Sequence, residues 1–427
     1  MKFVKILICI ALITLSCRKD MPNINRPNDY LINNFTSVFE SFWTGMNNNY
    51  IFWDIDPTDW DAIYDTYRPK FVELDINAPD DIKTAVKYFK EITKDLVDGH
   101  YILLINEIYS DLLGRDRLIS PSAERHRNRN YEQQKNDLSN FIFRDLQGRL
   151  NNPLRGVAHI AGDNTPLRML QGRVNNTAGK NICYFYFNRF AITPYLESIA
   201  NGKNIDDNEF TPIHKILETL FSALSDPQLD GVIIDMRGNE GGFESDLNIL
   251  WASFLAGQDV LAGTLRKKMG EGRLDYGQRT PYTLKPAEKL RHLSALKIPT
   301  NPKPVTAPIV ILADLNSISC AEISTVALSN LPNGYFVGET TWGGQGVLMD
   351  NDQAITIFNG GTFNNIFFDL VYTPFAKFEC VNGNNYEGKG YSPNDAPRGY
   401  EVKYNAAAIA AGNDPQFEKA LEIIINK

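Results

Sequence analysis

The sequence predicts an α/β fold, in which a mostly parallel sheet is preceded by an N-terminal helical domain. The first observation is that short, wholly apolar stretches alternate with helical patterns from residue 179 onward, as buried parallel strands and their connecting helices do. The second is that residues 30–104 show helical periodicity alone. The third is the length of 427 residues, which exceeds that of one typical domain.

The first 16 residues predict a secretory signal peptide. Lys2 and Lys5 precede an apolar run that ends in a serine, and this run is too short to predict a membrane-spanning helix. Cys17 follows, in a place that resembles the lipidated cysteine of bacterial lipoproteins; a chance cysteine is the alternative. We therefore expect a lipoprotein of the cell envelope, anchored to a bacterial membrane through Cys17 on its periplasmic or outer side. Residues 17–29 are expected to form a polar tether.

Residues 30–104 predict a helical domain. Aromatic residues recur at helical spacing from Phe35 to Trp43, and such a stripe is usually core. The segment 79–98 is the clearest amphipathic pattern, with one apolar face formed by Ile82, Ala85, Val86, Phe89, Ile92 and Leu96. It ends in Asp98-Gly99-His100, where Gly99 is expected to cap the helix. Because a histidine is favoured at a helix C-terminus, His100 has a structural explanation as well as a chemical one.

Residues 105–178 predict an irregular connector with a few strands and no convincing PDZ domain. The α/β core is expected at 179–427, with strands at 182–187, 231–237, 307–314 and 335–339 and helices at 211–224, 247–255 and 319–331. Thr211 is the expected N-cap of the first of these helices. Ligand sites in parallel sheets lie beyond the carboxyl ends of the strands, where three loops are expected to meet: 235–242, 314–319 and 338–346.

Ser319 stands where an apolar strand meets a helix. Together with Glu322 it forms a capping-box pattern, which would give the serine a purely structural role. A serine at this junction also suits a nucleophile, because the helix N-terminus and the following amide can stabilise an oxyanion. Both interpretations stay open on this stretch alone.

The pair Gly241-Gly242 follows another apolar strand. Without side chains, its backbone amides can approach a ligand closely, although a tight strand–helix turn explains the pair equally well. A phosphate-binding loop is disfavoured, since neither GxGxxG nor a following Lys-Ser/Thr is present.

Charge and cysteine content narrow the function classes. The net charge of −8, without a basic face or run, disfavours a nucleic-acid partner. Of five cysteines, Cys183, Cys320 and Cys380 remain after the signal and anchor are set aside, and their spacing predicts no zinc site and selects no disulfide. We expect no metal and no cofactor.

Four stretches in the order GVIIDMRGNEGG, ADLNSISCAEI, YFVGETTWGGQG and YEGKGYSPND resemble the successive motifs of the C-terminal-processing (tail-specific) serine peptidase family. The helical segment ending in LVDGH resembles the N-terminal domain of its members. The resemblance covers most of the chain except 1–29 and 105–178. It implies a crotonase- or ClpP-like catalytic core at 179–427, endopeptidase activity on a protein or peptide substrate, and no metal.

The resemblance implies roles for single residues. Ser319 falls at the nucleophile, and the amide of Cys320 with one of Gly241 or Gly242 falls at the oxyanion hole. In the bacterial tail-specific branch a lysine in the loop after GE is the base. Here that position is Gly344, so a Ser–Lys dyad in this register is excluded.

The chain is more similar to the branch of the tricorn core protease and the chlamydial secreted protease, which uses Ser, His and Glu. Its TWGG loop matches here, so that Trp342, Gly343 and Gly344 are expected to line the substrate. His100 then corresponds to the base and Glu387 to the acid that orients it. Two departures are Gly99, where the tricorn protease has a serine, and Asn394, which interrupts the Pro-Asp of the family.

Alternatives remain. The same fold could serve a catalytically silent ligand- or peptide-binding protein, or an acyl-CoA enzyme, which the secretory signal disfavours because CoA is cytosolic. Cys320 is a second candidate nucleophile, while His126, His159, His214 and His292 are expected to be structural or solvated. With His100 as base, activity is expected to fall at mildly acidic pH. The sequence does not specify an oligomeric state.

Overall fold

The computed structural model describes residues 33–127, 130–159, 165–193, 207–255, 258–270, 272–285, 303–348 and 367–427. The expected signal peptide, Cys17 and the whole expected tether lie outside these ranges. Among the described helices, none combines the length and the apolar character needed to cross a bilayer.

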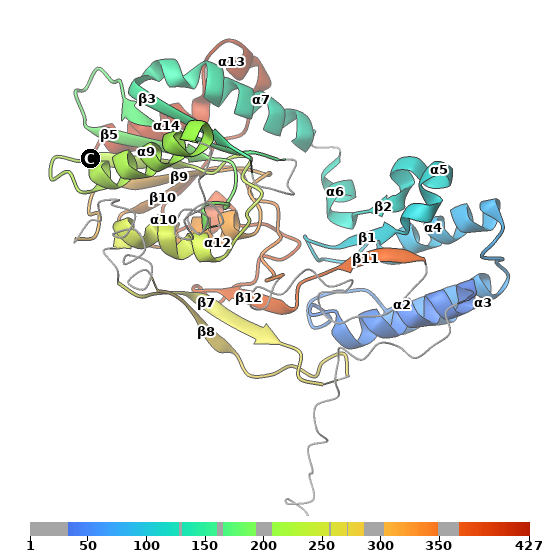
Figure 1. Cartoon of the computed structure of the whole chain (residues 1–427). Coiled ribbons are helices and arrows are strands. Elements are labelled where there is room, and N and C mark those ends of the chain that lie inside the picture. The colour runs from blue at the N-terminus through green and yellow to red at the C-terminus, as the bar shows by residue number, and fades with distance from the viewer. Residues whose placement is uncertain are drawn as a thin grey trace, which may run out of the picture.

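The N-terminal region is helical, as predicted. Its helices α2 (Phe35–Asn49), α3 (Trp60–Val72) and α4 (Pro79–Thr93) enclose an aromatic core in which Phe39 stacks on Phe71 with ring centroids 4.9 Å apart. All six apolar residues of the predicted amphipathic face are buried. Strand β1 (Ile102–Ile105) follows and pairs with β2 (Leu118–Ile119) and, antiparallel, with β11 (Phe368–Tyr372) from the C-terminal half (Figure 1).

The second region is built on a seven-stranded sheet. Its strands lie in the order β13 (Gly399–Glu401), β10 (Gly334–Gly338), β9 (Ile309–Ala313), β6 (Gly231–Asp235), β5 (Ile182–Phe187), β4 (Leu167–Val174) and β3 (Leu150–Ala158). The first five are mutually parallel, and β4 and β3 add on as an antiparallel pair. The predicted α/β class with a mostly parallel sheet is therefore confirmed.

Helices cover both faces of this sheet (Figure 1). Helices α9 (Asp207–Leu224), α10 (Ser245–Leu255) and α12 (Cys320–Ser329) share a core with Val232 and Ile234 of β6. Helices α7 (Tyr131–Arg144), α13 (Ala406–Ala410) and α14 (Pro415–Ile425) share another with Ile233. Because successive strand residues point to opposite faces, a wholly apolar strand serves both layers.

A small antiparallel sheet completes the molecule, in the order β12 (Ala376–Cys380), β7 (Val260–Lys267) and β8 (Thr280–Leu284). Short helices occupy the remaining segments: η1 (Glu107–Tyr109), α5 (Ser110–Leu113), η2 (Gly114–Arg117), α6 (Pro121–His126), η4 (Leu146–Arg149) and η5 (Pro393–Asp395).

Residues 105–178, expected to be an irregular connector, contain more order than that. They include α6, α7 and the strands β3 and β4, which extend the large sheet past the predicted boundary at residue 179. Strand β3 is the sheet edge and most of its residues are exposed, so it carries little of the apolar signal by which a strand is recognised.

Two local predictions are wrong. Helix α9 begins at Asp207 rather than after Thr211, so Pro212 lies inside it, near its start. Helix α4 ends at Thr93, and Gly99 lies in a turn beyond it rather than capping it. Glycine is required at position 99 for a different reason, because a Cβ atom there would collide with the carbonyl oxygen of Gly343.

Candidate active site

Ser319 occupies a strained position at the start of α12. Its backbone has φ 60° and ψ −121°, a conformation that residues with a side chain rarely adopt. The turn is held from both sides, because the Ser319 amide donates to the carbonyl of Gly344 (2.9 Å) and that of Ile318 donates to the carbonyl of Asn239 (3.0 Å). The side chain is half-buried. Backbone strain held by surrounding contacts is typical of a functional residue.

The glycine pair lies directly against this serine. A Cβ atom on Gly241 would be 2.6 Å from Cβ of Ser319 and 3.0 Å from the amide nitrogen of Cys320. The Gly241 amide already donates to Oδ1 of Asn239 (2.9 Å). Gly242 is exposed, and within the described residues no backbone or side-chain group accepts from its amide or from that of Cys320. Of the two glycines predicted for the oxyanion hole, the geometry therefore favours Gly242.

Glu322 organises the TWGG loop. Its buried carboxylate accepts hydrogen bonds from Oγ1 of Thr341 (2.5 Å), from the amides of Gly343 (2.9 Å) and Gly344 (2.7 Å), and from that of Ser319 (3.3 Å). Burial raises the pKa of Glu322 to about 7, against the opposing effect of these donors. The capping-box residue thus does more than cap α12, since it holds the loop against the helix start.

Trp342 connects this loop to the turn of His100. Its indole Nε1 donates to the carbonyl of Gly99 (3.0 Å). Its ring packs against His126 (centroids 4.4 Å apart) and, edge to face, against Tyr131 (5.2 Å). His126, expected to be structural or solvated, therefore supports the site through α6. Trp342 is partly buried, and its place in a substrate-lining loop stays a prediction.

His100 lies on the other side of Gly344. A Cβ atom on Gly344 would be 3.2 Å from Cε1 of His100, and the carbonyl of the same glycine accepts from Ser319. The imidazole is 9% exposed, and neither of its nitrogens has a hydrogen-bond partner in the described part of the chain. Burial lowers the pKa of His100 to about 4, which moves the expected loss of activity from mildly acidic pH towards pH 4.

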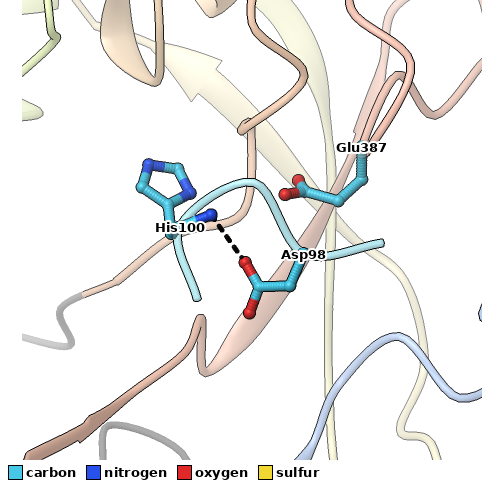
Figure 2. A group of neighbouring side chains, drawn as sticks. All are labelled: Asp98, His100 and Glu387. Carbon is cyan, nitrogen blue, oxygen red and sulfur yellow. Dashed lines mark hydrogen bonds between the residues drawn. The ribbon is translucent and has the colours of Figure 1, made fainter. Parts of the chain in front are cut away.

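Glu387 forms hydrogen bonds to both the turn of His100 and the end of the TWGG loop. Its Oε1 accepts from the amide of Gly99 (2.8 Å), and its Oε2 accepts from the amides of Gln345 and Gly346 (2.9 Å each). A carboxylate oxygen also lies within 4.8 Å of a ring nitrogen of His100 (Figure 2). Burial and the neighbouring Asp98 raise the pKa of Glu387 well above its usual range.

Asp98 is a further residue of the site, and the sequence alone assigned it no role. Its Oδ1 accepts from the backbone amide of His100 (2.8 Å), as the dashed line in Figure 2 marks, and its Oδ2 accepts from the hydroxyl of Thr373 (2.6 Å). It is fully buried, and burial raises its pKa to about 7. Its adjacency to His100 in the Asp-Gly-His triplet is the sequence signal that points to it.

Asp98, His100 and Glu387 are the one group of three or more His, Cys, Asp or Glu side chains among the described residues whose nitrogen and oxygen atoms lie within 4.8 Å of one another. Both carboxylates, however, are already engaged by backbone amides and by one hydroxyl. Each of the four carboxylate oxygens therefore accepts at least one hydrogen bond from the protein.

The described cysteines, Cys183, Cys320 and Cys380, are free and buried. The thiol of Cys320 contacts the carbonyl of Gly242 (3.4 Å), and burial raises its pKa, so it stays protonated and is a poor nucleophile. His159 is exposed just after the end of β3, His214 is partly buried in α9, and His292 lies outside the described residues.

Two family patterns match the chain. That of Peptidase family S41 matches residues 205–394, which contain the glycine pair, Ser319, the TWGG loop and Glu387. That of the Tricorn protease C1 domain matches residues 33–74, which contain α2 and α3.

Individual proteins are also similar to this chain. A solved structure from Parabacteroides merdae ATCC 43184, assigned as a peptidase, is similar with a TM-score of 0.58 and 19% identity, over 92% of this chain and 96% of the other. A lipoprotein from Streptococcus agalactiae gives a TM-score of 0.43 and 13% identity, over 93% and 98%. The nisin-resistance protein of Lactococcus lactis subsp. lactis is 29% identical over 143 residues, 34% of this chain and 41% of the relative's own length.

Proposed function

The chain belongs to peptidase family S41, and from this premise we propose that it is a serine endopeptidase that cleaves protein or peptide substrates through an acyl-enzyme on Ser319. One observation carries the proposal. The strained serine and a buried histidine without hydrogen-bond partners among the described residues lie on opposite sides of Gly344, more than 200 residues apart in the sequence. A fold has little structural reason to hold an imidazole in this way, whereas a general base beside a nucleophile is held so.

The first chemical step follows from these positions. Neutral His100 takes the proton of the Ser319 hydroxyl as the serine oxygen attacks the scissile carbonyl carbon. The carbonyl oxygen becomes an oxyanion, which the amides of Gly242 and Cys320 stabilise. Glu387 stabilises the imidazolium that forms.

In the second half of the reaction, His100 first donates the proton that it has taken up. The imidazolium gives its proton to the nitrogen of the leaving amine as the peptide bond breaks, which leaves an ester on Ser319. His100 then takes a proton from a water molecule that attacks the ester, and returns it to the serine oxygen. The low pKa of His100 keeps the base neutral throughout the neutral range, while a partner carboxylate has to stabilise its charged form.

We place this enzyme outside the cytoplasm, with a lipid anchor at Cys17. The basis is the charged start, the short apolar run and the cysteine after its small residue. Mass spectrometry of the protein from its native membrane tests the placement. A lipidated N-terminal peptide beginning at Cys17 is the expected result, and an unmodified peptide that continues upstream of Cys17 would contradict it.

Labelling with a fluorophosphonate probe tests the peptidase function. Wild type is expected to label at Ser319, Ser319→Ala not at all, and His100→Ala at least a hundredfold more slowly, because the base is lost. The matched control is Ser222→Ala, an exposed serine on α9, which should label as wild type does. A folded wild type that does not label would instead favour a silent binding protein on the same fold.

A further inference from the structure

The base of the proposed mechanism has two carboxyl groups beside it, although the mechanism uses one. Asp98 and Glu387 each place an oxygen within 4.8 Å of a ring nitrogen of His100 and of one another (Figure 2). Both are almost completely sealed from solvent, with exposed fractions of 0% and 2%. Two carboxylates this close and this dry do not both ionise readily, so they behave as a pair.

The hydrogen bonds of Asp98 and Glu387 indicate different roles for the two carboxyl groups. Glu387 accepts from three amides in two loops, so it is committed mainly to holding those loops together. Asp98 accepts from the backbone amide of His100 and from the hydroxyl of Thr373 on the strand connection after β11. Asp98 thereby links the residue that carries the imidazole to a second element of the core.

We propose that Asp98 is a positioning residue for the base: it fixes the turn that carries His100 and forms, with Glu387, a carboxyl pair that stabilises the protonated imidazole. Resting on the serine-peptidase function proposed above, this role explains the Asp-Gly-His triplet as a unit. Asp98 holds the turn, Gly99 lets the TWGG loop come close, and His100 takes the proton.

The surroundings suit a pair that carries about one negative charge. The guanidinium of Arg125 donates to the carbonyl of Leu96 (2.6 Å) and is the cation that offsets the charge of Asp98 and Glu387. The negative charge of Asp56 raises the pKa of Asp98 and so opposes a second negative charge on the pair. The titratable and charged groups around the pair are Tyr50, Asp56, Tyr101, Arg125, Glu322 and Tyr372. When His100 becomes charged, a single shared negative charge suffices to stabilise it.

The deciding variant is Asp98→Asn in the full-length protein, which keeps a side-chain oxygen for the His100 amide and removes the charge. We expect kcat to fall about tenfold with KM within about twofold, since the imidazolium forms after the substrate is bound. The acid limb of the kcat/KM profile, expected near pH 4 in wild type, should move to lower pH. Asp95→Asn, an exposed aspartate (70%) on the same segment, is the matched control and should change none of these.

A second measurement does not depend on turnover. In Ser319→Ala protein labelled with carbon-13 at the side-chain carboxyl groups, adding Asp98→Asn should lower the titration midpoint of Glu387 by at least about one pH unit, because its charged neighbour is gone. If Asp98→Asn does not fold, Thr373→Val replaces it. That variant leaves Asp98 without its hydroxyl donor and should shift the limb in the same direction by less.

The outcomes are separable. A kcat within twofold of wild type overturns the proposal, and so does a lower kcat with an unmoved acid limb and an unmoved Glu387 titration, because Asp98 would then be merely structural. If wild type shows no turnover at all, the peptidase function fails, while the Glu387 titration still decides whether the two carboxyls form a pair.

Discussion

At the scale of single residues, the site depends on groups kept in states they do not prefer. Ser319 has a backbone conformation suited to glycine, and His100 lies uncharged in a dry environment. Such costs persist only where the surrounding contacts impose them. Here those contacts are the hydrogen bonds of the Ser319 turn and the packing of Gly344 against the imidazole.

The strain at Ser319 is measurable. Ser319→Gly should be more stable than Ser319→Ala by about 1 kcal/mol, because glycine adopts φ 60° without a Cβ clash, which outweighs its larger entropy when unfolded. Both variants lack the nucleophile, so chemical denaturation compares them without interference from catalysis.

The control for this comparison is Ser222 inside α9, where the order reverses. Ser222→Gly should be less stable than Ser222→Ala by up to about 1 kcal/mol, because glycine is a poorer helix former than alanine and Ser222 lies in the last turn of α9. Equal stability of the two variants at position 319 would mean that the serine turn is relaxed.

At the scale of elements, the TWGG loop is a connector between the two halves of the site. Glu322 holds it to the start of α12, where Ser319 lies. Trp342 holds it to the turn of His100, and Glu387 joins its far end to the same turn. The loop contains no acid–base group of its own, but its backbone sets the spacing between Ser319 and His100.

Trp342→Phe tests this connection. The substitution removes the indole donor to the carbonyl of Gly99 and keeps a ring to pack on α6 and α7. The carbonyl retains its bond from the hydroxyl of Ser122 (2.9 Å), so a stability loss of only about 1 kcal/mol is expected. Because the turn of His100 gains freedom, the labelling rate should fall roughly tenfold.

The matched control is Trp43→Phe, which removes an indole donor to the carbonyl of Trp60 (2.8 Å) within the N-terminal helices. It should cost a similar amount of stability and leave the labelling rate unchanged. Equal effects of the two variants on labelling would show that the Trp342 bond is ordinary packing support.

At the scale of the whole molecule, the site places several acids in the interior. Burial raises the pKa of Asp98 and Glu322 to about 7 and that of Asp314 to about 6, and it raises that of Glu387 further. Asp314 accepts from the amide of Gly238 (3.0 Å) and so holds the start of the glycine loop. These groups link folding to pH.

Stability should therefore rise as pH falls from about 8 to about 5. A carboxyl whose folded pKa is raised stabilises the fold fully below its unfolded value near 4, and that contribution is lost as pH rises through about 6 to 7. His100 has the opposite effect: its pKa is lowered from 6.5 to about 4, so it destabilises the fold as pH falls through this range. The four buried carboxyls are expected to outweigh this single histidine. Urea denaturation across this range measures the slope.

Glu322→Gln should reduce this slope, because one of the four carboxyls no longer titrates. A stability that falls steadily from pH 8 to pH 5 in wild type would mean that the buried acids are ionised throughout.

The sequence by itself determined the local parts of this protein. It predicted the α/β class, the helical N-terminal region and the three loops at the carboxyl ends of strands, because apolar periodicity and turn residues act over short distances. It also indicated Ser319, the glycine pair and the absence of a lysine from the TWGG loop, each of which is a property of a few neighbouring residues.

Only the tertiary structure decided what these parts do to one another. It showed that the amide of Gly241 donates to Asn239, which favours Gly242 for the predicted oxyanion hole. It also showed that Asp98 accepts from the amide of His100 and that Glu387, 288 residues from Gly99, accepts from the amide of that glycine. It also lowered the pKa of His100 through burial. Hydrogen bonds between distant segments and the removal of water leave no periodic trace in a chain, so they become visible only once the chain is folded.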